Sequence, residues 1–130
     1  MISVNKNIRI TSSFSSSERD SIKKAVTEKI EKLITPKTRA MLFTNPGNPT
    51  GVVLSHEEIE MLVDIATKHD LYLIGDEAYR EFIYTDNSKL ESFAEFKNAE
   101  NNIIVIDTVS KRFSACGARI GCIISRNEKL

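Results

Sequence analysis

The sequence predicts an α/β fold, because three short apolar runs alternate with segments whose apolar residues recur at helical spacing. The runs are residues 40–43, 71–74 and 103–106, and each has the length of a buried strand. The connections between them are long enough for right-handed crossovers, so we expect a mostly parallel sheet flanked by helices, as a three-layer sandwich. The 130 residues are enough for a single domain with a core.

Two segments carry both a helix start signal and a helical apolar pattern. Ser15 and Glu18 have the spacing of a capping box, and Ser55 and Glu58 repeat it. Apolar residues then recur every three or four positions, at Ile22, Val26, Ile30 and Leu33 in the first segment and at Ile59, Leu62, Val63 and Ala66 in the second. We expect the first helix to end near Pro36, and a further helical stretch around residues 90–97.

A fourth strand is expected from about Arg119 to Ser125. Only about nine residues separate Val109 from Arg119, which is too few for a crossover helix. The fourth strand should therefore run antiparallel to the third.

The composition argues against several classes of partner. Eighteen basic residues balance eighteen acidic ones, so the chain has no long-range field that would attract nucleic acid or an anionic membrane. No apolar run has the length of a bilayer span, and residues 1–10 contain no apolar segment typical of a secretory signal. Cys116 and Cys122 have no metal-ligand spacing. We expect a cytoplasmic protein without a metal site.

Polar, loop-forming segments follow each of the three parallel strands. Residues 45–51 hold two prolines, two glycines and two asparagines, which excludes regular structure there. Asp76, Glu77 and Tyr79 follow the second strand, and residues 107–111 follow the third. Because ligands of open α/β sheets bind outside the carboxyl ends of the strands, these segments predict a site that contains an amide, a carboxylate, a phenol and a lysine.

Three of these segments resemble the class I and II aminotransferases, in the same order and at similar intervals. They are Asn-Pro-Gly-Asn-Pro-Thr-Gly at 45–51, Asp-Glu-Ala-Tyr at 76–79, and Ser-Lys at 110–111 followed by Gly-Ala-Arg-Ile-Gly at 117–121. The resemblance runs from roughly residue 35 to 126, and residues 104–125 are most similar to aspartate aminotransferases. It implies part of the large domain of a fold-type-I enzyme that depends on pyridoxal 5′-phosphate (PLP).

The resemblance assigns a catalytic role to three residues. Lys111 matches the lysine that holds the PLP aldehyde as a Schiff base and can shuttle a proton. Asp76 matches the carboxylate that pairs with the pyridinium nitrogen and keeps the ring electron-withdrawing. Tyr79, together with Asn48, matches the donors to the phenolate oxygen of the cofactor. Taken alone, each residue could be a turn, core or surface residue, and only their joint order carries the assignment.

The resemblance also implies a phosphate site. Arg119 lies eight residues after Lys111, as in the family, and a guanidinium forms the charge-assisted fork that suits a phosphate. Thr108 and Ser110 match hydroxyl positions that contact the same phosphate. The other polar residues nearby, namely His56, His69, Glu77 and Glu81, are expected to have structural or surface roles.

The implied activity is amino-group transfer between an α-amino acid, aspartate-like by preference, and a 2-oxo acid, in a protein that forms a homodimer at full length. Three alternatives stay open. The same cradle serves β-lyases and aminocyclopropane-carboxylate synthases, and it serves PLP-sensing modules of transcription regulators. The chain could also be an inactive structural fragment.

Several parts of the family's machinery have no match in this sequence. These are the phosphate-binding loop and the ring-stacking aromatic of the N-terminal part of the large domain, and the carboxylate-binding arginine of the small C-terminal domain. We therefore expect residues 1–130 to form one partial PLP-binding domain, which by itself should not transaminate and should bind PLP weakly if at all.

Overall fold

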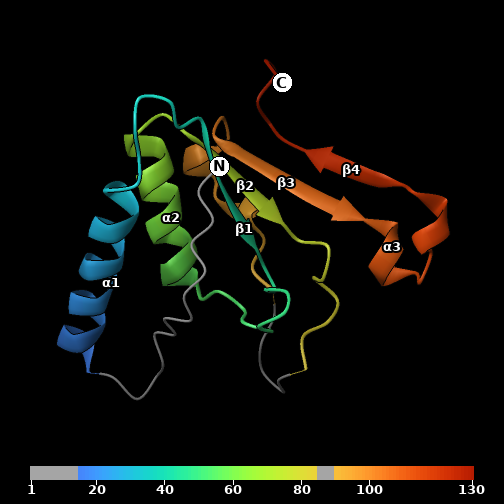
Figure 1. Ribbon diagram of the computed structural model, residues 1–130, viewed down its shortest axis with the longest axis horizontal. Coiled ribbons are helices and arrows are strands. Elements are labelled where there is room, and N and C mark those ends of the chain that lie inside the picture. The colour runs from blue at the N-terminus through green and yellow to red at the C-terminus, as the bar shows by residue number, and fades with distance from the viewer. Residues whose placement is uncertain (1–14, 85–89) are drawn as a thin grey trace.

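The computed structural model describes residues 15–84 and 90–130 (Figure 1). Its first element, α1, is an α-helix over Ser16–Glu31. The capping box is present as expected: the Ser15 side chain accepts from the Glu18 N–H, and the Glu18 carboxylate accepts from the Ser15 N–H at 2.9 Å. The helix ends before Pro36 in a short turn. Residues 1–10, where we expected no secretory signal, lie outside the described residues.

Four strands form one sheet in the order β1-β2-β3-β4. Their bounds are Ala40–Thr44 for β1, Tyr72–Asp76 for β2, Ile103–Thr108 for β3 and Gly121–Ile124 for β4. β1 and β3 both pair parallel with β2, whereas β4 pairs antiparallel with β3. The predicted α/β architecture, with a mostly parallel sheet flanked by helices and an antiparallel last strand, is confirmed.

The hydrophobic core lies between the sheet and α2, an α-helix over His56–Lys68. Alternate strand residues point to this side, because successive side chains of a strand face opposite ways. Met41, Leu73 and Val105 are each at most 1% exposed there. The apolar face of α2 contributes Ile59, Leu62, Val63, Ile65 and Ala66. α1 packs on α2 and contributes Ile30, so two helices cover one face of the sheet.

On the same face of the sheet, the Phe93 ring packs directly against Gly75. A Cβ atom at Gly75 would lie 2.4 Å from Cδ2 of Phe93, which is fully buried. Only a residue without a side chain lets the Phe93 ring lie directly on β2. Phe93 begins a 3₁₀ turn, η1, over Phe93–Glu95, and a second 3₁₀ turn, η2, spans Lys97–Ala99.

The strand residues that alternate with Met41, Leu73 and Val105 face the other side of the sheet. Leu42, Ile74, Ile104 and Ile106 are only partly buried, and Ile123 of β4 is 74% exposed. The register places Asp76 opposite Ile106 and Thr44, so the carboxylate belongs to this second face. None of the helices in the described part of the chain is long and apolar enough to cross a membrane.

The structure differs from the sequence-based expectations at several boundaries. β2 and β3 each run two residues further than expected, because Asp76 and Thr108 still pair with neighbouring strands. β4 begins at Gly121 rather than Arg119. The helical stretch expected around residues 90–97 consists of the two 3₁₀ turns. A four-residue helix, α3, spans Val109–Arg112, where we expected a plain connection.

Candidate active site

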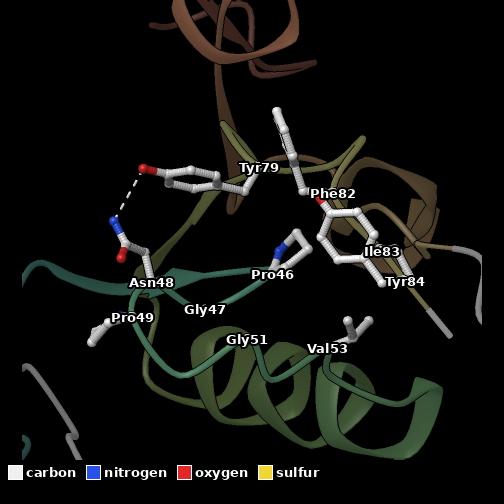
Figure 2. Close-up of a pocket in the computed structure, with 10 residues that line it drawn as sticks. All are labelled: Pro46, Gly47, Asn48, Pro49, Gly51, Val53, Tyr79, Phe82, Ile83 and Tyr84. Atoms are coloured by element: carbon white, nitrogen blue, oxygen red, sulfur yellow. Dashed lines mark hydrogen bonds between the residues drawn. The ribbon is translucent and has the colours of Figure 1, made fainter.

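The loop after β1 holds Asn48 in place at the carboxyl end of the sheet. Asn45 is fully buried, and its Oδ1 accepts from the Leu54 N–H at 3.0 Å. The Gly47 N–H donates to the Val52 carbonyl at 2.8 Å and closes the loop on itself. The exposed Asn48 side chain then donates from Nδ2 to the Tyr79 hydroxyl at 3.1 Å (Figure 2). An amide and a phenol from two different strand ends therefore meet.

Asp76 is the last residue of the central strand β2. Its carbonyl accepts from the Asn45 N–H at 2.9 Å, which ties β2 to the loop after β1. Its Oδ1 accepts from the Ala78 N–H at 3.1 Å, which fixes the turn that leads to Tyr79. β2 lies between β1 and β3 in the sheet. Asp76 therefore lies between the end of β1, which leads to Asn48, and the end of β3, which leads to Lys111.

Lys111 lies on α3, directly beyond β3. Thr108 caps this helix: its Oγ1 accepts from the Ser110 N–H at 3.2 Å. The Lys111 side chain is exposed, and its Nζ lies 5.5 Å from the centroid of the Tyr79 ring. That is within the range of a cation–π contact. The lysine thus lies beside the phenol that binds Asn48.

Arg119 lies across a surface hollow from the α3 cap. Its backbone is left-handed, with φ of 53°, and its Nη1 donates to the Cys116 carbonyl at 3.4 Å. Thr108, Ser110 and Arg119 all line one hollow of about 300 Å³, and the hydroxyl oxygens of Thr108 and Ser110 are 3.0 Å apart. Two hydroxyls and a guanidinium around one hollow form a donor set for an anionic group such as a phosphate.

A chain of charged residues joins the two sides of the site. Arg80 Nη1 lies 3.6 Å from Glu77 Oε2 and 4.0 Å from Asp107 Oδ2. Arg112 Nη2 lies 3.1 Å from Asp107 Oδ2 and 3.1 Å from Glu81 Oε1. Sequence reasoning assigned no site role to these five residues, and the signal it missed is the alternation of acidic and basic residues directly beside the motif residues.

Sequence reasoning also missed an apolar pocket of about 390 Å³ behind Asn48 and Tyr79 (Figure 2). Phe82, Ile83 and Tyr84 line it from one side, and Pro46 and Val53 line it from the loop after β1. Pro46 lies within the first motif, and the other four residues follow the motifs in sequence. Nearness to the motifs is the signal that could have pointed to them.

The seven residues that the sequence singled out lie at one end of the sheet. Asp76 and Thr108 are the last residues of β2 and β3, and Asn48, Tyr79, Ser110 and Lys111 follow β1, β2 and β3. Arg119 precedes β4, which is antiparallel to β3 and so begins at that same end. The structure brings Asn48, Tyr79 and Lys111 together through direct contacts. Thr108, Ser110 and Arg119 share one hollow. Asp76 and Thr108 belong to the same face of the sheet, two residues apart in register, because Asp76 lies opposite Ile106.

Comparison with known proteins identifies the family. A family model described as aminotransferase class I and II matches residues 11–130. An aspartate aminotransferase of Thermotoga maritima is 40% identical over 101 residues, which cover 78% of this chain and 26% of that protein. An aromatic-amino-acid aminotransferase of Thermococcus litoralis is 39% identical over 94 residues, which cover 72% of this chain and 24% of that protein.

A solved structure shows the same likeness in three dimensions. An aspartate aminotransferase of Thermus thermophilus, studied as a double mutant, superposes with a TM-score of 0.71 at 32% identity. The match covers 78% of this chain and 26% of that one. The chain belongs to the class I and II aminotransferase family. It spans about a quarter of the length of the curated relatives it matches.

Proposed function

We propose that this chain supplies the central PLP-binding segment of an aminotransferase. The observation that carries the proposal is the contact of Asn48, Tyr79 and Lys111 beside the hollow shared by Thr108, Ser110 and Arg119. The donor sets fit the cofactor: a guanidinium and two hydroxyls suit its phosphate, and a carboxylate suits its pyridinium nitrogen. A lysine on the same rim suits its aldehyde.

When bound, PLP supplies an electron sink for the substrate's Cα. Lys111 Nζ would hold the cofactor at its aldehyde group and, when free, would carry a proton to and from the substrate's Cα. The Asp76 carboxylate would pair with the pyridinium nitrogen and favour its protonated form. Asn48 and Tyr79 would donate to the phenolate oxygen, because their own hydrogen bond already brings both polar groups to one point.

The substrates we propose are an α-amino acid and a 2-oxo acid. An aspartate-like amino acid agrees with the name of the Thermotoga maritima relative, whereas the Thermococcus litoralis relative is named for aromatic amino acids. Cytoplasmic location and a homodimeric assembly of the full-length protein are further parts of the proposal. Both rest on the family to which the chain belongs.

The first prediction tests the role of Lys111. Incubation of the chain with PLP, followed by borohydride reduction and peptide mapping, should label Lys111 in preference to the chain's other lysines. Lys111→Ala should abolish that label, because the replaced side chain supplies the nucleophile. Lys37→Ala, a change at the amino end of the sheet, should leave the Lys111 label unchanged. A label spread over all exposed lysines, with no preference for Lys111, would refute the proposed site.

A further inference from the structure

The helix that carries Lys111 is too short to hold its own position. α3 has four residues. An isolated helix of that length is unstable in water, because the free energy lost in ordering the backbone exceeds the free energy gained from the hydrogen bonds of one turn. Its two basic residues, Lys111 and Arg112, are both exposed. The Thr108 cap fixes where α3 begins, but it does not fix α3 relative to the segment that contains Tyr79. Other contacts must do that.

Arg112 makes those contacts. Its Nη2 reaches Asp107 at the end of β3 and Glu81 in the segment after β2, at 3.1 Å in each case. The side chain of Asp107 is only 14% exposed, whereas that of Glu81 is 55% exposed. The contact between Arg112 and Asp107 is therefore better shielded from solvent, and it holds the guanidinium against the end of β3. The contact between Arg112 and Glu81 links α3 to the segment after β2.

This bridge runs alongside the contact between Lys111 and Tyr79. Arg112 is the residue after Lys111, and Glu81 lies two residues after Tyr79. Both contacts are made by Nη2, which carries two N–H groups, so this one nitrogen can donate to both carboxylates at once. The planar guanidinium fixes the directions of those two donors. Arg80 supports the same arrangement from the other side, since it lies 4.0 Å from Asp107.

We propose that Arg112 is a positioning residue that holds Lys111 against Tyr79 by bridging Asp107 and Glu81. The reactivity of Lys111 toward an aldehyde rests on the proposed function, but the position of the lysine does not. The loss of the bridge leaves the backbone of β3 intact and lets α3 move relative to the segment after β2. Lys111 then spends less time beside the Tyr79 ring.

The second prediction concerns Arg112→Ala in the 130-residue chain. In NMR spectra with isotope-labelled lysine, the Lys111 ε-methylene signal should move toward its random-coil position, because the Tyr79 ring no longer shifts it. Labelling of Lys111 by PLP and borohydride, relative to Lys37 in the same sample, should fall about two- to fivefold, the size expected for a partly exposed ion pair. Arg39→Ala removes an arginine at the amino end of the sheet and should change neither readout.

Glu81→Gln is a second variant that leaves the fold intact, because the side chain is more than half exposed. It should shift the Lys111 signal in the same direction, and the double variant with Arg112→Ala should add little, since both changes remove one bridge. Glu60→Gln, at another exposed glutamate, is the matched control. An unchanged Lys111 signal in both Arg112→Ala and Glu81→Gln would overturn the proposal. If wild-type Lys111 takes no label, the proposed function fails, while the NMR signal still decides the positioning role.

Discussion

Glu77 is a single residue whose ionisation the fold opposes. The side chain is fully buried, and Oε1 accepts from the Ser92 hydroxyl at 2.8 Å and the Phe93 N–H at 2.9 Å. Oε2 has no hydrogen-bond partner within the described residues, and Arg80 Nη1 stays 3.6 Å away. Burial raises the pKa of the Glu77 carboxyl above its ordinary value, against the lowering effect of the hydrogen bonds and of Arg80.

The third prediction follows from that shift. A carboxyl with a raised pKa in the folded state favours folding most below its unfolded pKa, and this contribution is lost as the pH rises through the folded pKa. Glu77→Gln keeps the size and the Oε1 acceptor but cannot ionise. We therefore expect the melting temperature of Glu77→Gln, measured by circular dichroism, to increase relative to that of wild type as the pH rises from acid to neutral.

Glu100→Gln, which removes an exposed carboxyl, is the control for this pH series. Its melting temperature should depend on pH as that of wild type does. A constant difference between Glu77→Gln and wild type at every pH would show that folding does not shift the pKa of the Glu77 carboxyl. It would contradict the third prediction.

Motif residues could be placed from the sequence, whereas the residues that hold them could not. Asn48, Tyr79 and Lys111 each lie within a few residues of the end of a strand, so a parallel sheet is enough to bring them to one rim. The contacts of Arg112 with Glu81 join side chains from two strand ends. Such a pairing depends on how far apart those ends lie and on their orientation, and a local pattern does not contain that information.

At the scale of single elements, the same cap begins three segments of this chain. Ser15 with Glu18, Ser55 with Glu58 and Ser92 with Glu95 each form a complete capping box. The first two were predictable because they depend on residues three positions apart and precede a regular apolar pattern. The third precedes only a 3₁₀ turn, within the stretch around residues 90–97 that was expected to be helical, and its cap was not recognised.

The fourth prediction compares two of these caps. Ser55 caps α2, which has seven buried residues, whereas Ser15 caps α1, in which only Ile30 is buried. Ser55→Ala should lower the free energy of unfolding in urea by about 1 kcal/mol. Ser15→Ala should cost less, because the first turn of α1 can fray without uncovering the core.

Ser55→Asp, which keeps an acceptor at the cap, should recover most of the loss caused by Ser55→Ala. Equal losses for Ser55→Ala and Ser15→Ala would mean that both helices unfold with the core. The fourth prediction would then be wrong.

The strand ends show where element-scale reasoning reached its limit. Gly75 and Asp76 are common turn residues, so the apolar run before them indicated the end of the strand. The strand nevertheless continues, because β1 and β3 offer backbone partners on both sides up to Asp76. Pairing with neighbours outweighed the local preference.

At the scale of the whole molecule, the sheet ends in a strand with exposed apolar side chains. β4 is an edge of the sheet within the described residues. Ile123 is 74% exposed and the neighbouring Ile120 is 59% exposed, while Phe113 beyond α3 is 67% exposed. Exposed apolar edges favour pairing with other chains, and a net charge of zero provides little repulsion against it.

The fifth prediction is that Ile123→Lys reduces self-association of the chain. A charge on an edge strand opposes strand addition and removes apolar surface. Analytical ultracentrifugation over a range of concentrations should show a lower average mass for this variant than for wild type. Leu33→Lys, at a residue that is 52% exposed and distant from the sheet edge, should behave like wild type. A wild-type chain that stays monomeric at high concentration would refute the prediction.

The antiparallel return of β4 also bears on the order in which the two sides of the site form. β3 and β4 pair Val105 with Ile124 across a short loop, whereas β1 and β2 pair Ala40 with Tyr72 across the whole of α2. Closing a shorter loop loses less chain entropy, so local pairings form early during folding. We expect the half that carries Lys111 and Arg119 to assemble before the half that joins Asn48 to Tyr79, so that the phenol reaches the lysine only in the last folding step.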